Sequence, residues 1–295
     1  HKIKDEEMEG VDLSSWHVAL NGAEPISLST MEDFGKRFSK WGFKPTAMTA
    51  VYGLSEASLA VTFSELKSPP EIRNRPGTED HPIVGVGRPL PGFEVEVRND
   101  QGERLPELQE GQIWIKGPSL MKEYLDDPVA TAAVMAEGWL NTGDLGFIAE
   151  QKLYVVGRSK EVLIFRGRNI APHEVESALD DVEGVRRGCV AAVGIRPENS
   201  HSDELVLLVE RGTEQTDETG LIEACNKAVL EKTGLRCHQV AILEPGTLPR
   251  TSSGKIRRVD AGKRFEAGTL AAAPEPGILG IAGAVVRSTL VMPRS

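Results

Sequence analysis

The pattern of apolar and polar positions predicts alternating strands and helices over the first 63 residues. Apolar strands are predicted over 16–22 and 45–53, and the segment 29–43 between them has apolar residues at helical spacing behind a Ser or Thr cap. A short helix or turn follows over 55–63. Strand–helix–strand order predicts a parallel sheet, which places ligand chemistry at the carboxyl ends of its strands.

Short alternating strands are predicted next, over 84–157. The preceding segment, 64–83, contains four prolines and mixed charge, which favours a loop. Strict alternation in 93–100 and 111–117 predicts a small antiparallel sheet or barrel. One helix is expected over 127–138, with proline at its first position.

A different organisation begins near residue 158 and indicates a compact α+β domain. Strands are predicted over 152–167, 188–195, 204–212 and 238–246, and helices over 172–182 and 219–235. We therefore expect a boundary and candidate hinge at 157–161, with domains over 1–157 and 158–266. The tail 267–295, rich in Ala, Gly and Pro, is expected to be loosely ordered.

Composition excludes several classes of protein. The chain has 295 residues and a net charge of −10, which argues against binding to nucleic acid or to an anionic membrane. Its three cysteines have no CxxC or metal-ligand spacing, which favours a reducing, cytoplasmic setting. No signal pattern is found, and the longest apolar stretch, 276–286, is shorter than the roughly 20 residues of a membrane span.

Two motifs in the first 63 residues could contact a nucleotide. In "NGAEPI", Gly22 and Ala23 follow a strand, so bare backbone could lie against a flat ring. In "VYGLSEASL", Tyr52 could stack on an aromatic ligand, Ser55 could donate to a phosphate, and Glu56 could hold Mg²⁺. Taken alone, each motif is better explained without a ligand: the first as an ordinary turn at the end of a strand, the second as a tyrosine packed at a sheet edge and a glutamate at a helix start.

Three later motifs carry further polar chemistry. Asp144 in "NTGDLG" could accept two hydrogen bonds from vicinal hydroxyls, and Arg158 in "GRSK" could grip a ribose or phosphate. Lys255, in the flexible-looking "TSSGK" run, could bring a positive charge onto a transferring phosphate. The alternatives are an aspartate capping its own turn, a hairpin surface charge and a solvated basic tail.

The order and spacing of these motifs together are more specific than any one of them. They resemble the adenylate-forming superfamily of acyl-CoA synthetases, firefly luciferases and peptide-synthetase adenylation domains. The segments "VALNGAEPI", "YGLSEASLAVTF", "GPSLMKEYL", "LYVVGRSKEVLIFRGRNIAP" and "LPRTSSGKIRR" look most like fatty acyl-AMP ligases, and the resemblance covers roughly 11–266. It implies the end of a large domain, with α/β sheet strands and a small antiparallel β-barrel, followed by a mobile α+β lid.

The resemblance implies that ATP and a fatty acid give an acyl-adenylate, whose acyl group then passes to a thiol. Glu56 would bind Mg²⁺, Lys255 would act in adenylation, and Lys160 would be the hinge. Within the nucleotide site, the adenine would contact Gly22, Ala23, Glu24 and Tyr52. The α-phosphate would contact Ser55, and the ribose hydroxyls would bind to Asp144 and Arg158. The residues expected to bind the nucleotide are Gly22, Ala23, Glu24, Tyr52, Gly53, Ser55, Asp144 and Arg158.

The chain also departs from the resemblance. The Ser/Thr/Gly-rich phosphate loop and the first half of the large domain are missing, so we expect a C-terminal half that binds ATP poorly and catalyses little alone. Fatty acyl-AMP ligases usually carry a longer insertion where 64–83 stands. The acceptor therefore remains open between an acyl-carrier-protein thiol and CoA, which would make the parent an acyl-CoA synthetase. A non-catalytic interaction module is the alternative from another class.

Overall fold

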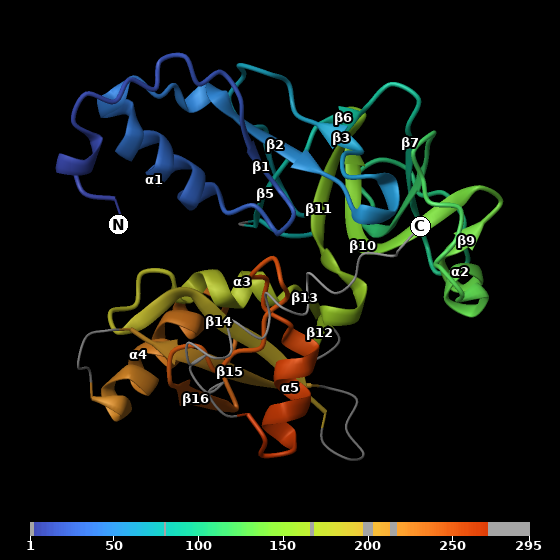
Figure 1. The fold of residues 1–295 in the computed structure, drawn as a ribbon. Coiled ribbons are helices and arrows are strands. Elements are labelled where there is room, and N and C mark those ends of the chain that lie inside the picture. Colours follow the sequence, from blue (N-terminus) through green and yellow to red (C-terminus); the bar gives the residue numbers. More distant parts are fainter. Residues whose placement is uncertain (1–2, 80, 166–167, 197–202, 213–216, 271–295) are drawn as a thin grey trace, which may run out of the picture. The chain divides into compact units, whose positions relative to one another are not determined.

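The computed structural model describes residues 3–79, 81–165, 168–196, 203–212 and 217–270 (Figure 1). The chain divides into two compact units, His1–Ser177 and Ala178–Ser295, each described here by itself. The mixed α/β class expected from the sequence is confirmed. The hinge at 157–161 and the domain bounds 1–157 and 158–266 stay predictions, and most of the predicted tail, 271–295, lies outside the described residues.

The first unit combines short helices with four sheets in its described residues. Its helices and 3₁₀ turns are η1 (Glu6–Met8), α1 (Leu28–Phe38), η2 (Ser39–Trp41), η3 (Pro45–Ala47), η4 (Ser55–Ala57), α2 (Pro128–Val134), η5 (Ser159–Glu161) and α3 (Pro172–Glu176); η6 (Ser177–Leu179) crosses into the second unit. Its strands are β1 (Ala19–Asn21), β2 (Met48–Tyr52), β3 (Thr62–Phe63), β4 (Ile72–Asn74), β5 (Pro82–Val84), β6 (Arg88–Pro89), β7 (Glu94–Arg98), β8 (Gly111–Lys116), β9 (Met135–Ala136), β10 (Trp139–Ala149), β11 (Lys152–Arg158), β12 (Leu163–Phe165) and β13 (Arg168–Ile170).

Helix α1 begins where the sequence predicts but ends earlier. The hydroxyl of Ser27 caps it by accepting a hydrogen bond from the Thr30 amide, and Met31 is buried. Gly42 has a φ of +84°, which no helix allows, so the predicted helix over 29–43 ends at Phe38 and continues only as η2.

The predicted parallel pairing is found between β1 and β2, where Ala19 lies opposite Met48. The sheet then continues through β3 and β6, both antiparallel, in the order β1-β2-β3-β6. Because β1 and β2 run in the same direction, their carboxyl ends lie at one edge of the sheet. The glycines that follow them, Gly22 and Gly53, therefore stand at this same edge.

The predicted loop over 64–83 is wrong in part, because β4 lies inside it and pairs antiparallel with β5. Ile72 lies opposite Val84, and the connection between the strands is closed by a hydrogen bond from the Thr78 amide to the Arg75 carbonyl. This pairing tolerates the neighbouring prolines because β4 and β5 form a sheet of only two strands, and proline is accepted on edge strands.

The predicted antiparallel sheet is present as β11-β10-β8-β7, with β9 pairing β10. Alternate residues of β8 and β10 turn into the core, where Ile113, Ile115 and Leu140 are at most 1% exposed. They pack with Ala50 of β2 and with Val61, which precedes β3, so the two sheets share one core in this unit. That core fixes β2 relative to β10, the two strands that carry Tyr52 and Asp144.

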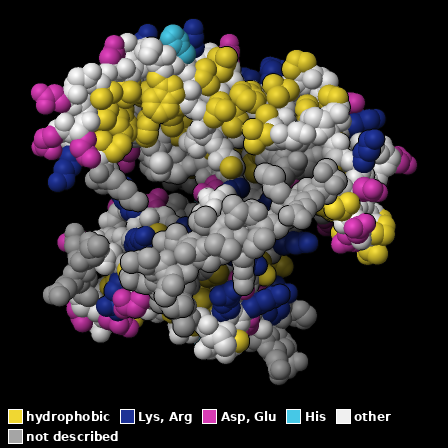
Figure 2. Space-filling model, viewed as in Figure 1, with side chains coloured by type: hydrophobic (Ala, Val, Ile, Leu, Met, Phe, Trp, Pro, Cys, Tyr) yellow, Lys and Arg dark blue, Asp and Glu magenta, His cyan; other side chains and the backbone are white. Residues whose placement is uncertain are grey.

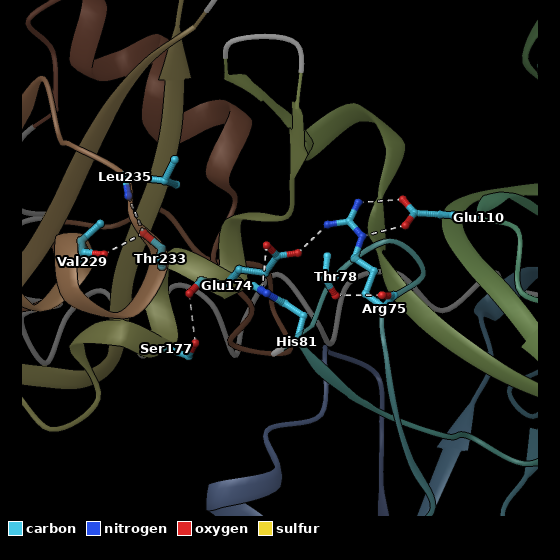
Figure 3. Close-up of polar contacts among 9 residues, drawn as sticks. All are labelled: Arg75, Thr78, His81, Glu110, Glu174, Ser177, Val229, Thr233 and Leu235. Carbon is cyan, nitrogen blue, oxygen red and sulfur yellow. Dashed lines mark hydrogen bonds and ion pairs between the residues drawn. The ribbon is translucent and has the colours of Figure 1, made fainter.

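A buried network of charges lies away from these strands (Figure 3). Arg75 donates two hydrogen bonds to Glu110, at 2.7 and 2.8 Å, and a third to Glu174 of α3 at 2.6 Å. The Nε2 atom of His81 lies 2.9 Å from the other oxygen of Glu174. The side chains of Arg75 and Glu174 are 8% and 7% exposed, so the network ties α3 to the β4–β5 hairpin.

The second unit is a three-stranded sheet with two helices. Its elements are β14 (Val185–Ile195), β15 (Glu204–Arg211), α4 (Glu218–Thr233), β16 (Gln239–Leu243) and α5 (Arg258–Glu266). β14 and β15 are antiparallel, and β15 and β16 are parallel. The sequence did not predict α5, whose Ala261 is buried against the sheet near Val193 and Leu208. Among the described residues, every helix is too short or too polar to span a bilayer.

Candidate nucleotide site

Glycines at the carboxyl ends of β1 and β2 allow close backbone approaches, Gly22 toward β2 and Gly53 toward Leu59. A Cβ atom on Gly22 would lie 2.4 Å from the carbonyl oxygen of Val51, and one on Gly53 would lie 1.5 Å from that of Leu59. Real atoms do not come so close, so both positions require glycine. Ala23 has a φ of +70°, which is uncommon for a residue with a side chain. The turn after β1 is thus held directly beside β2.

Three predicted site residues lie in contact. The Tyr52 hydroxyl, at the end of β2, donates a 2.7 Å hydrogen bond to Oδ2 of Asp144, although 92 positions separate them. Asp144 lies opposite Arg158 in the β10–β11 register, and Nε of Arg158 lies 3.3 Å from Oδ1. Asp144 is 8% exposed, whereas the Arg158 side chain is 65% exposed. A buried carboxylate is therefore held between a hydroxyl and an exposed cation.

The groups around Asp144 shift its pKa in opposite directions. Burial raises the pKa of Asp144 above its ordinary value, while the hydrogen bond from Tyr52 and the charge of Arg158 lower it. Burial, together with the neighbouring carboxylate, raises the pKa of Tyr52 well above its ordinary value, so this phenol stays a donor. The Thr142 hydroxyl accepts a hydrogen bond from the Asp144 amide at 3.1 Å, within the stretch of β10 where the pairing with β8 is irregular.

Glu56 is supported by residues that motif analysis did not assign. Its Oε1 accepts a 2.9 Å hydrogen bond from the hydroxyl of Tyr124, and its backbone carbonyl accepts one from the Met121 amide at 2.7 Å. Burial and the Glu56 carboxylate raise the pKa of Tyr124. Tyr124 lies in "GPSLMKEYL", a segment on which the resemblance partly rests. The sequence therefore pointed to this segment, but not to the hydrogen bond from Tyr124 to Glu56.

The fit of this region to Mg²⁺ rests on Glu56. The described residues contain no group of three or more His, Cys, Asp or Glu side chains arranged to hold a metal ion. Mg²⁺ typically takes one or two carboxylates and completes its shell with water and substrate phosphates. Glu56 is half-buried, and within the described part of the chain its carboxylate is hydrogen-bonded only to a neutral phenol, so it has the chemistry of such a ligand.

The remaining predicted residues are placed as follows. Ala23, Glu24 and Ser55 are exposed near the ends of β1 and β2, and Lys160 is exposed in η5. Lys255 belongs to the second unit and is half-buried. The structure thus brings Tyr52, Asp144 and Arg158 together, while the roles given to all of these residues stay predictions.

Two cavities in the first unit lie away from the candidate nucleotide site. One, of about 390 Å³, is lined by Phe63, Glu71, Arg88 and Lys152 among others. The other, of about 430 Å³, is lined partly by Val95, Leu105, Ile148 and Leu153. None of the predicted site residues lines either cavity, so the cavities do not mark the candidate site.

Hydrophobic side chains gather on one part of the surface of the first unit (Figure 2). Large exposed hydrophobics precede or lie in β1, namely Val11, Trp16, Val18 and Leu20, the last 57% exposed. β1 is also at the edge of its sheet in the described residues. Apolar surface beside a free strand edge is typical of an interaction face.

Comparison with known families decides the class of protein. The family model "AMP-binding enzyme" matches residues 1–125, and the model "AMP-binding enzyme C-terminal domain" matches residues 167–262. The chain belongs to the AMP-binding enzyme family. The resemblance inferred from the motifs is thereby confirmed at the level of the adenylate-forming superfamily.

The chain is similar to named relatives over nearly its whole length. It is 33% identical over 287 residues to the "Putative acyl-CoA synthetase" of Caulobacter vibrioides, covering 91% of the chain and 50% of that protein. It is 32% identical over 293 residues to the medium-chain-fatty-acid–[acyl-carrier-protein] ligase JamA of Moorena producens. That match covers 90% of the chain and 50% of JamA.

Solved structures agree with the sequence relatives. A structure from a study of fatty acyl-adenylate ligases from E. coli and L. pneumophila superposes with a TM-score of 0.81 at 32% identity. The match covers 90% of the present chain and 50% of the chain in that structure. The chain spans about half the length of the curated relatives it matches.

Proposed function

We propose that this AMP-binding chain is part of a ligase that activates a fatty acid as its acyl-adenylate and transfers the acyl group to an acyl-carrier-protein thiol. The contact of Tyr52 and Arg158 with the buried Asp144 carries this proposal. It supplies a charged acceptor and a neighbouring cation beside the glycine turns that follow β1 and β2, which suits a ribose next to a purine ring. The relatives named as fatty-acid ligases support the acyl substrate.

The first half-reaction joins the acid to AMP. A carboxylate oxygen of the fatty acid attacks the α-phosphorus of ATP, the bond to the β-phosphate oxygen breaks, and pyrophosphate leaves. Mg²⁺, held in part by Glu56, would neutralise charge on the phosphates. Asp144 and Arg158 hold the ribose hydroxyls, Ser55 contacts the α-phosphate, and the ammonium of Lys255 stabilises the anionic transition state.

The second half-reaction moves the acyl group. The thiol of the acceptor attacks the acyl carbonyl carbon, the bond to the phosphate oxygen breaks, and AMP leaves. Lys255 acts in the first step and must withdraw for the second, so we propose that residues 158–266 turn about Lys160 between the two. We further propose a cytoplasmic enzyme.

The chain taken alone should catalyse little. We propose that a further part of the large domain packs against the exposed apolar side chains around β1 and supplies a phosphate-binding loop. The 50% coverage of the relatives supports this, as does the 57% exposure of Leu20. Without that part, the expected acid-dependent exchange between ATP and pyrophosphate falls to background.

An acyl-CoA synthetase is the second candidate. It is favoured by the names of two relatives, one an acyl-CoA synthetase and one a fatty-acid–CoA ligase, and by the short segment 64–83. Both candidates use the same first half-reaction and differ only in the thiol.

The decisive test uses the full encoded protein with fatty acids of graded length. Acid-dependent exchange of labelled pyrophosphate into ATP is expected, and its complete absence would support a non-catalytic module. Competition between free CoA and a phosphopantetheinylated carrier protein then identifies the acceptor. Faster acyl transfer to CoA would replace the first candidate by the second.

The raised pKa of Asp144 predicts the pH dependence of nucleotide binding. If the ionised carboxylate accepts from the ribose, affinity is lost as pH falls through this pKa, at a higher pH than for an exposed aspartate. Tyr52→Phe removes a donor that lowers this pKa, so the acidic loss of affinity should move to higher pH. Titration calorimetry of the full encoded protein with a non-hydrolysable ATP analogue, from about pH 4 upward, measures this loss of affinity. Tyr154→Phe, in the core but away from Asp144, should leave the profile unchanged.

A further inference from the structure

The run that carries Lys255 forms a closed turn. The Thr251 amide donates to the Lys255 carbonyl at 2.8 Å, and the Lys255 amide donates to the Thr251 hydroxyl at 3.1 Å. The Gly254 amide also donates to the Thr251 carbonyl at 2.9 Å, with Gly254 at a φ of +90°. The Ser-Ser-Gly composition suggested a shapeless loop, but its hydrogen bonds give Lys255 a defined backbone position.

One side chain connects this turn to the sheet of the second unit. Nη1 of Arg250 donates to the Gly254 carbonyl at 2.7 Å. Nη2 of the same guanidinium lies 3.2 Å from the Gly188 carbonyl oxygen and 3.1 Å from Sγ of Cys189, both in β14. Arg250 therefore bridges the residue before Lys255 to a strand in the core.

The base of the turn is held by a buried carboxylate. Glu210 of β15 is fully buried, and its Oε1 accepts a hydrogen bond from the Leu248 amide at 2.9 Å. Its other oxygen pairs with Arg186 at 2.7 Å. The Arg257 amide donates to the Pro249 carbonyl at 2.8 Å and closes the two arms of the turn. The turn is thus anchored at its base by Glu210 and at its tip by Arg250.

A guanidinium suits this bridge because its planar fork presents several donors in fixed directions. Methionine would keep most of the aliphatic packing but remove every donor. Lysine would keep the charge, but a single ammonium group cannot reproduce the planar geometry toward the turn and β14 together. Since misplacing a reacting group by about 1 Å can cost about 10²-fold in rate, loss of the bridge should be visible in catalysis.

We propose that Arg250 is a positioning residue for Lys255: by tying the Gly254 carbonyl to β14, it sets where the Lys255 ammonium points during adenylation. The inference rests on the proposed function. It assigns Arg250 no contact with substrate, so its effect must pass through Lys255.

The test compares Arg250→Met and Arg250→Lys with Arg257→Met in the full encoded protein. Arg257 is a matched control, because it is a cation two residues from Lys255 whose side chain pairs with Asp260 of α5 and not with the turn. With dodecanoic acid as probe, Arg250→Met should lower kcat for ATP–pyrophosphate exchange by about 10- to 100-fold, with less than about a 3-fold change in KM for ATP. Arg250→Lys should recover part of this loss, and Arg257→Met should show little change.

Two further measurements separate positioning from general damage. In a Lys255→Ala background, Arg250→Met should lower exchange by less than about 2-fold more, because the group it positions is gone. Amide hydrogen exchange should accelerate over residues 249–257 in Arg250→Met and stay unchanged in α4.

The outcomes distinguish the two proposals. Exchange in the wild type with equal kcat in Arg250→Met and Arg257→Met would overturn the role of Arg250 alone. Full additivity with Lys255→Ala, or unchanged amide exchange over 249–257, would overturn it as well. Absence of acid-dependent exchange in the wild type with any fatty acid would overturn the proposed function and, with it, this inference.

Discussion

Lys255→Ala is expected to lower acid-dependent ATP–pyrophosphate exchange by about 10²- to 10³-fold, the cost of removing one preorganised stabilising group from a transition state. The negative charge grows on the phosphate oxygens as the carboxylate attacks, and Lys255 supplies a compact positive charge on a defined turn. Binding of ATP should weaken much less, because the interaction between Lys255 and the phosphate oxygens is strongest in the transition state. Stopped assays of exchange across ATP concentrations separate kcat from KM.

A second half-reaction provides the internal control. When the acyl-adenylate is supplied ready-made, Lys255→Ala should transfer the acyl group to the thiol at nearly the wild-type rate. Lys263→Ala removes an exposed cation of α5 and should leave both half-reactions unchanged. Equal losses in both half-reactions would contradict a role confined to adenylation.

The contact between Tyr52, Asp144 and Arg158 could be anticipated only through the order of motifs. Hydropathy predicted the strands β2 and β11, whereas Asp144 was expected between turn glycines and lies within the long strand β10. Nothing in local pattern joins Tyr52 to a residue 92 positions away, because that pairing depends on how two sheets share a core. The resemblance supplied this missing long-range information.

Other features escaped prediction for physical reasons. The β4–β5 hairpin was hidden by prolines and charges, whose presence is usual for a loop but permitted at strand edges. Helix α5 was not predicted because it begins with a basic residue and shows no apolar stripe. Only Ala261 of its nine residues is buried. Arg75 gave no signal at all, since a buried arginine is identified by its partners, and these lie 35 and 99 positions away.

Arg75→Met is expected to lower the free energy of unfolding of the first unit by about 3–5 kcal/mol. The change leaves the carboxylates of Glu110 and Glu174 in a buried place without their main cation, and breaking a buried ion pair from one side typically costs this much. All four tryptophans, Trp16, Trp41, Trp114 and Trp139, lie in this unit, so their fluorescence in urea reports its unfolding. Arg73→Met is the matched control, because its partner Glu150 is exposed and such pairs contribute about 0–1 kcal/mol.

The same network predicts how this unit responds to acid. Despite burial, His81 and Arg75 hold the pKa of Glu174 below its ordinary value, so folding favours the ionised form. The resulting stability is present above the ordinary pKa of a glutamate and is lost as pH falls through the lower, folded value. Arg75→Met removes the guanidinium that lowers the pKa of Glu174, so the acid transition should begin at higher pH than in the wild type. Adding Glu110→Gln and Glu174→Gln removes the stranded charges and should recover much of the loss at neutral pH. If the triple variant is no more stable than Arg75→Met, the cost comes from packing and not from unpaired charge.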